Sequence, residues 1–177
     1  MIFHYNEMQD VENLFLEVSK AIDDRDITSA KELLEEILLI DPGYGRAHNH
    51  LGWIYETKIK DFKRAKRHYE LAIKFCKGSY PVVYVNYGYL LIEFGEWDLA
   101  EKIIEEGLLV PGADKATLLY QKGKIAEHRQ NYVQAFKTYE LAKKMNFNKD
   151  FHTMLLNEIS RVQSKMSFWD KLRLWSI

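Results

Sequence analysis

The segment LGWIYETKIKDFKRAKRHYELA, residues 51–72, contains a pattern that recurs along the chain. It contains two small residues, Gly52 and Ala65, and two aromatic residues, Phe62 and Tyr69. The alanine of this pattern returns at a constant interval of 35 residues, as Ala30, Ala65, Ala100 and Ala135. A fixed period of this length is typical of repeat architectures, in which each unit packs on its neighbours.

Three further columns keep the same period. Their members are Ile27, Phe62, Trp97 and Tyr132, then Leu34, Tyr69, Ile104 and Tyr139, then Ile37, Ala72, Gly107 and Ala142. A column upstream, formed by Val18, Gly52, Gly88 and Gly123, varies by one residue in its spacing. We assign that irregularity to the turn inside each unit, and expect these turns at residues 24–26, 58–61, 95–96 and 130–131. Pro and Gly separate the units, as in Asp41-Pro42-Gly43 and Pro111-Gly112.

The glycines of the upstream column lie inside expected helices, where Gly costs about 1 kcal/mol relative to Ala. We therefore expect the backbone of the partner helix to come too close at these positions for a Cβ atom. The periodic alanines, among them Ala65, Ala100 and Ala135, would supply the facing small surface.

These motifs resemble the tetratricopeptide repeat. The pattern Leu51-Gly52-x-x-Tyr55 followed by Phe62-x-x-Ala65-x-x-x-Tyr69-x-x-Ala72 is close to the signature of that family. The resemblance covers about residues 11–149 and implies an all-α chain, folded as a right-handed α-solenoid of four helix-turn-helix repeats. The repeats would span about residues 11–44, 45–80, 81–114 and 115–149.

Two segments follow the repeats. Residues 150–166 have an apolar stripe and a polar face, which predicts a capping helix for the end of the stack. We thus expect one domain over residues 1–166 and an amphipathic aromatic tail over residues 167–177. The tail, a short helix, contains four large apolar residues, Phe168, Trp169, Leu172 and Trp175. Such a group should not remain exposed on a monomer. We therefore expect one of three arrangements of the tail. It folds back on the capping helix, it docks in a groove of this chain or of a second copy, or it anchors at a membrane surface. Docking on a second copy would produce self-association.

Composition excludes several classes of protein. The 177 residues include 25 Lys and Arg against 26 Asp and Glu, and a single cysteine, Cys76. A balanced charge disfavours nucleic-acid binding, and one cysteine excludes a disulfide framework. A helical period of 35 residues also occurs in pentatricopeptide proteins that read RNA, an alternative disfavoured by the same lack of positive charge. No apolar run approaches the ~18 residues of a membrane span, and the residues near Glu7 and Asp10 do not form a signal peptide, so we expect a cytoplasmic protein.

The near-zero net charge conceals strong blocks. The four repeats carry net charges of −6, +6, −6 and +6 in chain order. Neighbouring repeats should therefore attract one another through ion pairs. In the second interpretation, the basic repeats offer a stripe of lysines and arginines to an acidic partner.

We find no constellation of catalytic residues. His48 and His50 are two positions apart, so on a helix they point in different directions and do not share a metal ion. The glycines lie in helices or turns rather than in a phosphate-binding loop. We expect no enzyme activity, no cofactor and no metal site.

The family resemblance implies that the first helix of each repeat lines a concave groove. The candidate groove residues are Phe15, Arg46, Asn49, Trp53, Val85, Tyr89, Tyr120 and Lys124. Aromatic side chains give a large contact area at low entropic cost, so such a groove suits an apolar or aromatic peptide or helix. In the other interpretation, some of these rings fill the gap between neighbouring first helices. The sequence therefore predicts a non-catalytic protein–protein interaction module that acts as scaffold, adaptor or chaperone-like subunit, or else a structural protein that self-associates through its tail.

Overall fold

The structure is a computed structural model that describes the backbone of residues 2–76 and 78–175, and the side chains of residues 9–76 and 78–174. This described part consists of helices and turns, with no strand. The chain divides into two compact units, residues 1–86 and 87–177. None of the helices described is both long enough and apolar enough to cross a bilayer.

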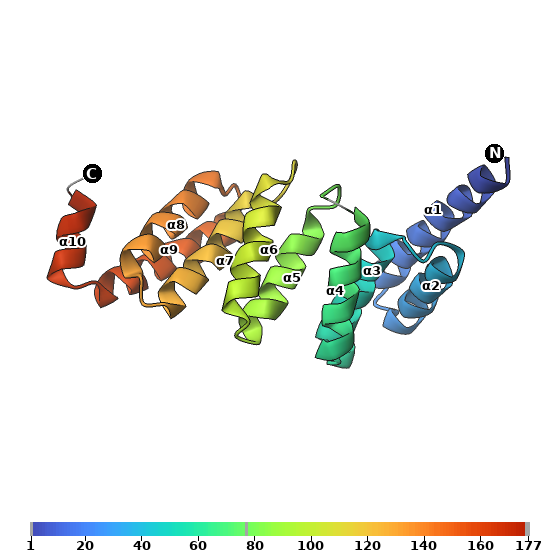
Figure 1. Cartoon of the computed structure of the whole chain (residues 1–177), viewed down its shortest axis with the longest axis horizontal. Helices are drawn as coiled ribbons and strands as arrows, with labels where there is room; N and C mark the ends of the chain where they lie inside the picture. Colours follow the sequence, from blue (N-terminus) through green and yellow to red (C-terminus); the bar gives the residue numbers. More distant parts are fainter. Residues whose placement is uncertain (1, 77, 176–177) are drawn as a thin grey trace. The chain divides into compact units, whose positions relative to one another are not determined.

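Unit 1 contains two helix pairs (Figure 1). Its elements are α1 (Ile2–Asp23), α2 (Ile27–Ile40), α3 (Gly45–Ile54), the π-helical turn η1 (Tyr55–Ile59), α4 (Phe62–Cys76) and the start of α5 (Val82–Glu93). Helix α1 packs on α2, and α3 packs on both α2 and α4. The buried faces follow the periodic columns, because Ala30, Leu34 and Tyr69 are fully buried.

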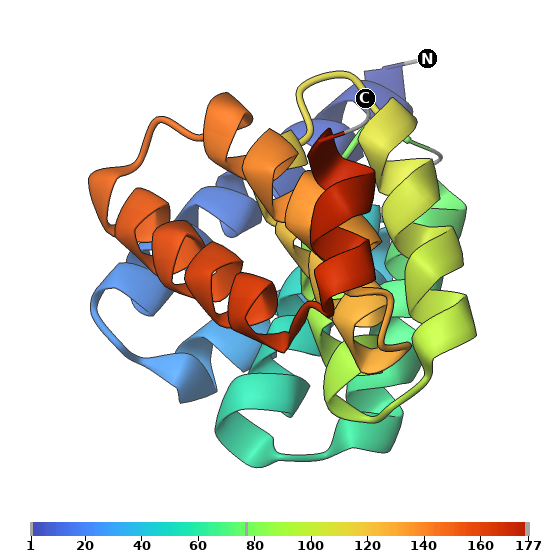
Figure 2. The ribbon, with the colours of Figure 1, turned by 90° about the vertical axis from the view of Figure 1, so that its left-hand side faces the viewer.

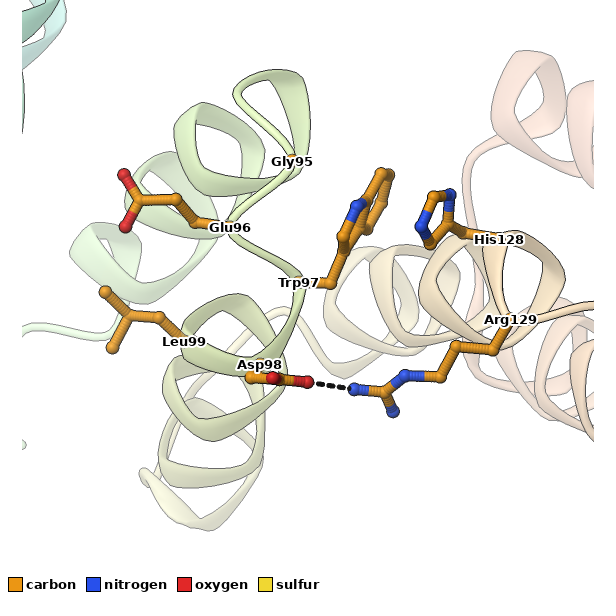
Figure 3. A pocket seen from close by; sticks show the side chains of 7 residues that line it. All are labelled: Gly95, Glu96, Trp97, Asp98, Leu99, His128 and Arg129. Carbon is orange, nitrogen blue, oxygen red and sulfur yellow. Dashed lines mark hydrogen bonds and ion pairs between the residues drawn. The ribbon is translucent and has the colours of Figure 1, made fainter.

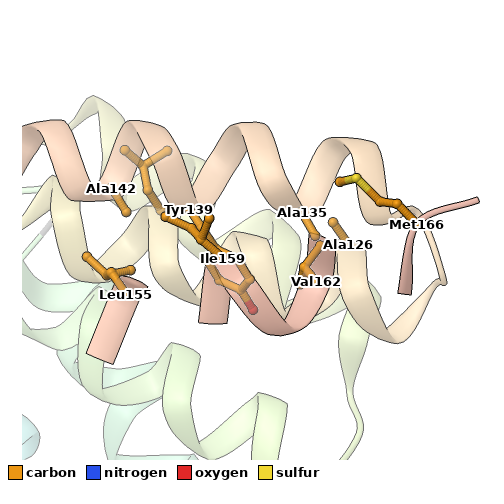
Figure 4. Packing of buried hydrophobic residues seen from close by; sticks show 9 residues of the cluster. Ala126, Ala135, Tyr139, Ala142, Leu155, Ile159, Val162 and Met166 are labelled. Atoms are coloured by element: carbon orange, nitrogen blue, oxygen red, sulfur yellow. The ribbon is translucent and has the colours of Figure 1, made fainter. Parts of the chain in front are cut away.

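Unit 2 continues the pattern after the division within α5. Its further helices are α6 (Trp97–Leu109), α7 (Lys115–His128), α8 (Tyr132–Met145), α9 (Lys149–Lys165) and α10 (Phe168–Trp175). The apolar stripe of α9, formed by Leu155, Ile159 and Val162, packs against Ala135 and Tyr139 of α8 (Figure 4). The all-α chain of helix pairs predicted from the sequence is therefore confirmed for the described residues.

The turn inside each helix pair is built in the same way. Residues 25, 60, 95 and 130 all have positive φ, and only the third of them is a glycine. In three of the turns the next residue caps the second helix: the side chains of Asp26, Asp61 and Asn131 accept the backbone N–H three residues later, whereas Glu96 forms no such bond. The backbone N–H of the same residue closes the first helix by donating to a carbonyl five residues earlier, as from Asn131 to Ala126 at 2.9 Å.

The second repeat departs from this geometry. The turn was expected at residues 58–61, but the helix continues as η1 to Ile59, and only Lys60 turns the chain. Here Asp61 donates to the carbonyl of Tyr55, six residues earlier, at 2.9 Å. Gly52 and Ala65 are 13 residues apart, whereas Gly88 and Ala100 are 12 apart. The extra residue is thus absorbed as a widened helical turn, which keeps the second helix in register.

The explanation predicted for the glycines is wrong in its detail. A Cβ atom on Gly52 would lie 2.7 Å from the ring of Tyr69, and one on Gly123 would lie 2.3 Å from the ring of Tyr139. The obstacle is therefore a buried tyrosine of the paired helix, rather than its backbone or the alanines Ala65 and Ala135. Over Gly88 the nearest atom is Oε1 of Gln121, at 2.4 Å.

The tail is helical, but it does not lie back along the capping helix, as one interpretation expected. Helix α10 contacts α8 and runs at a steep angle to α9 (Figure 2). Leu174 packs against the core of unit 2, whereas Phe168, Trp169 and Leu172 are exposed. The backbone of Trp175 ends α10, and its side chain lies outside the described residues.

Candidate functional site

The candidate groove residues of unit 1 include an arginine fixed on three sides. The Arg46 guanidinium lies 4.0 Å from the centre of the Phe15 ring, and its Nη1 is 3.2 Å from a carboxylate oxygen of Glu12. The Tyr44 hydroxyl donates to the same carboxylate at 2.8 Å. Because Arg46 already has a carboxylate partner, it joins α1 to α3 and its charge is largely compensated.

Burial separates the eight candidate residues into two groups. Phe15 and Asn49 are buried, with 5% and 2% exposure. Asn49 accepts a hydrogen bond of 3.1 Å from the Asn86 amide, so it ties α3 to α5. These two side chains fill the gap between neighbouring first helices, which is the second of the two interpretations drawn from the sequence.

Among the candidate groove residues of unit 1, Trp53 is the accessible ring. It is half-buried, and the Lys58 ammonium lies 5.1 Å from the ring centre. Lys58 reaches the ring from η1, and the Thr57 hydroxyl donates to the Trp53 carbonyl at 2.8 Å within the same turn. Val85, on the first turn of α5, is also half-buried. The inserted residue of the second repeat therefore shapes the surface beside Trp53.

Unit 2 presents two tyrosines and a lysine. Tyr120 is half-buried between the rings of Tyr139 and Phe151, whose centres are 5.8 and 5.7 Å away. The Lys124 ammonium lies 5.8 Å from the Tyr120 ring. Tyr89 is 41% exposed. As in unit 1, an accessible ring lies beside a lysine, so the surface can hold an apolar group next to an anionic or polar one.

Glu127 is the centre of a charged network that the sequence did not single out. Its side chain is only 10% exposed and pairs with Arg161, and with Lys165 at 2.9 Å. The Tyr139 hydroxyl also donates to Glu127, at 3.3 Å. Burial favours the neutral acid, but the hydrogen bonds from Arg161 and Lys165 outweigh it and hold the pKa of Glu127 below its usual value. This network fastens α9 to α7.

Glu127 and Arg161 are 34 residues apart, and so are Glu12 and Arg46. Residues one period apart lie at matching levels on consecutive first helices. Opposite charges at that separation were therefore a signal present in the sequence.

Ion pairs also join the third and fourth repeats. Arg129 binds Asp98 and Glu101, each at 2.7 Å, and Lys122 binds Glu105 at 2.6 Å. Figure 3 shows the pair of Arg129 and Asp98 at one side of a hollow of about 420 Å³. Acidic side chains of one repeat thus meet basic side chains of the next, as the alternating block charges predict.

The same hollow contains a ring stack. The Trp97 and His128 rings lie nearly parallel, with centres 3.8 Å apart (Figure 3). Trp97 belongs to one of the periodic aromatic columns, and the stack places it between α6 and α7. The hollow is open and its walls are engaged in contacts between repeats, so we assign it a structural role.

Two histidines meet in unit 1, although they are 20 residues apart. The Nδ1 atoms of His48 and His68 are 3.0 Å apart, and Nε2 of His48 is 3.1 Å from the Pro42 carbonyl. Burial lowers the pKa of both rings, that of His68 to about 4. Both rings are therefore neutral near pH 7. Among the described residues, no group of three side chains of His, Cys, Asp or Glu is arranged to hold a metal ion.

Comparisons with known proteins agree on the fold. Residues 45–77 match the sequence model of the tetratricopeptide repeat family. PilF of Pseudomonas aeruginosa has a TM-score of 0.79 and 19% identity, covering 90% of this chain and 70% of PilF. BtubC of P. vanneervenii has a TM-score of 0.73 and 15% identity, covering 88% of this chain and 72% of BtubC.

The tetratricopeptide repeat domain of Arabidopsis OM64 is also similar. It has a TM-score of 0.59 and 19% identity, covering 69% of this chain and 96% of the domain. No curated protein matches the sequence.

The paired helices of the two units, closed by a cap, define an α-helical repeat protein. Residues 45–77 match one tetratricopeptide repeat, and the chain shares the fold of a solved tetratricopeptide repeat domain. Repeats of this kind mediate protein–protein interactions and are typically non-catalytic scaffolds.

Proposed function

We propose that this chain is a non-catalytic interaction module that binds an apolar or aromatic peptide or helix through the first helices of its repeats. It would serve as scaffold, adaptor or chaperone-like subunit. The observation that supports the proposal is the pairing of an accessible ring with a lysine in each unit, Trp53 with Lys58 and Tyr120 with Lys124. Rings of this kind are the usual anchors of peptide binding.

The proposed contact residues are those that remain accessible. In unit 1 they are Arg46, Trp53 and Val85, and in unit 2 they are Tyr89, Tyr120 and Lys124. Phe15 and Asn49 are buried, so they are not proposed as contact residues. The domain division into residues 1–166 and a tail of 167–177, and the cytoplasmic location, stay predictions.

A peptide library tests the proposal. Random 16-residue peptides displayed on phage are selected against the full chain, and the affinities of enriched peptides are measured by calorimetry. We expect enriched sequences with aromatic or aliphatic anchors. Trp53→Ala and Tyr89→Ala should each weaken their binding at least about tenfold, which corresponds to 1.4 kcal/mol.

Phe147→Ala is the matched control, because Phe147 is a fully exposed ring in the loop between α8 and α9. It should leave the affinity unchanged. If the enriched peptides bind Trp53→Ala and Tyr89→Ala as tightly as the wild type, the proposed surface is wrong.

A further inference from the structure

The C-terminal end of unit 2 presents an unusual apolar surface. Phe168 and Trp169 on α10 are 69% and 70% exposed, and Leu172 is 45% exposed. The two rings touch edge to face, with centres 5.7 Å apart. Exposed apolar groups that adjoin one another are typical of an interaction site, whereas isolated ones need no explanation.

The helix that carries these groups is held in place. Ser167 and Asp170 form a reciprocal cap: the Ser167 hydroxyl donates to Asp170 at 2.8 Å and accepts from the Asp170 backbone N–H at 3.1 Å. Leu174, on the opposite face of α10, packs into the core of unit 2. With Leu174 inward, Phe168 and Trp169 lie on the exposed face of α10. Figure 2 shows that α10 follows α9 at the C-terminal end of unit 2.

Unit 1 has an uncovered surface on α1. The repeat alignment places Leu16 at the same position as His50, Asn86 and Gln121. Each of these three contacts the preceding repeat: His50 meets Phe15, Asn86 donates to Asn49, and Gln121 lies over Gly88. Leu16 itself is 69% exposed. An apolar side chain therefore occupies a position that elsewhere faces a preceding repeat.

The two ends carry opposite charge. Residues 1–44 contain eleven acidic and three basic side chains, whereas residues 115–177 contain five acidic and twelve basic ones. Within the chain, consecutive repeats are already joined by acidic–basic pairs such as Glu12 with Arg46 and Glu101 with Arg129. A second copy placed with its acidic first repeat against the basic end would continue the same alternation.

We propose that copies of this chain associate head to tail, with Phe168, Trp169 and Leu172 of one copy packed against the α1 surface around Leu16 of the next. None of the residues proposed to bind a peptide takes part. Each ring contributes about 150–250 Å² when fully buried, so the apolar patch supplies less than the ~800 Å² per partner of a stable interface. The remaining attraction is electrostatic, and we expect a dissociation constant on the order of 10–100 μM.

Head-to-tail contact uses two different surfaces and need not close on itself, so oligomers should grow with concentration. Sedimentation equilibrium of the full chain, from about 5 to 500 μM, should show an average mass that rises past that of a dimer. Raising the salt concentration from about 0.05 to 0.5 M should reduce that mass, because salt screens the attraction between the ends. A monomer throughout this range would refute the proposal.

Complementation distinguishes head-to-tail from tail-to-tail contact. Trp169→Glu disables one end and Leu16→Glu the other, and both side chains are exposed enough that folding should be unaffected, as circular dichroism will show. Each variant alone should be monomeric. Mixed together, they should form a one-to-one dimer and nothing larger, since each retains the end that the other lacks. Leu39→Glu and Leu109→Glu are the control variants, because both leucines are 85% exposed but lie outside the two proposed contact surfaces. Both variants should assemble like the wild type.

Other outcomes are equally decisive. If Leu16→Glu assembles by itself while Trp169→Glu does not, the contact is between two tails and the proposal is wrong. If both variants assemble like the wild type, a different surface is responsible and the proposal is wrong. If the variants fail to restore a dimer when mixed, the two ends are not complementary.

Discussion

The substitution Gly123→Ala should destabilise the protein, even though alanine is the better helix former. A Cβ atom at this position would lie 2.3 Å from Cε1 of Tyr139 and 2.9 Å from its Cζ. Tyr139 is fully buried, so its ring has no free space to enter. Overpacking costs about 1–3 kcal/mol, and a contact this short belongs at the upper end. Helix propensity returns about 1 kcal/mol, so the free energy of unfolding should fall by about 2 kcal/mol.

Other repeats provide the controls for this prediction. In the first repeat the column of Gly123 holds Val18 and the column of Tyr139 holds Leu34, so a Cβ is tolerated where the ring is absent. Gly88→Ala meets the end of the Gln121 side chain, which can rotate, rather than a ring. We expect that its overpacking and its propensity gain nearly cancel, with a net change below about 1 kcal/mol.

The assay is urea denaturation followed by far-UV circular dichroism. It compares Gly123→Ala, Tyr139→Leu and the double variant, which pairs a residue that has a Cβ atom with a leucine, as Val18 and Leu34 do in the first repeat. If the ring is the obstacle, the double variant should be about 1–2 kcal/mol more stable than the sum of the two single changes predicts. Equal effects of Gly123→Ala with and without Tyr139, or a Gly123→Ala protein as stable as the wild type, would refute the explanation.

Four further substitutions test the turns and the charged groups. Gln130 has a φ of 58°, a conformation that favours glycine, so Gln130→Gly should raise the free energy of unfolding by about 0.5–1 kcal/mol. Gly95 has a φ of 73°, so Gly95→Ala should lower it by about 1 kcal/mol. Urea denaturation measures both changes. Glu127→Ala removes the hydrogen-bond acceptor of Arg161, Lys165 and Tyr139, so thermal denaturation should show that the free energy of unfolding falls by about 1–3 kcal/mol. Removal of the more exposed ion pair of Lys122 with Glu105 should lower it by less than about 1 kcal/mol. Acid should also destabilise the protein: His68 has a pKa of about 4 when folded and 6.5 when unfolded, so stability is complete above pH 6.5 and is lost as the pH falls towards 4. Between pH 6.5 and 5, the free energy of unfolding of His68→Gln should fall by about 1 kcal/mol less than that of the wild type, as measured by denaturation at each pH. If both proteins lose stability equally over this range, the buried ring does not resist protonation.

The periodic columns were sufficient to predict the helix pairs. Leu34, Tyr69, Ile104 and Tyr139 recur at 35 residues because each packs into the same position of its own unit, so period alone predicts burial. The turns were nearly predictable as well. The extra residue between Gly52 and Ala65 was visible as an irregular spacing, but a longer loop and a π-helical turn have the same residue count.

The candidate binding surface was predicted less well than the fold. A position on a first helix does not say whether its side chain faces a partner or the next helix. Phe15 and Asn49 are buried, while Trp53 and Tyr89 are accessible. The exposure of each of these side chains depends on which side chains of the following repeat pack against it. The meeting of His48 with His68 depends on the crossing of two helices and has no periodic signature.

The sequence alone thus determined which residues repeat, which of them are buried within a helix pair, and how charge alternates between repeats. These properties depend on local periodicity and composition, which the chain expresses directly. Only the tertiary structure decided which atoms lie over each glycine, which rings of the first helices remain exposed, and that α10 contacts α8 with its aromatic face outward. These depend on the distance and angle between helices, which are fixed by side chains far apart in the sequence and so are not encoded in any one repeat.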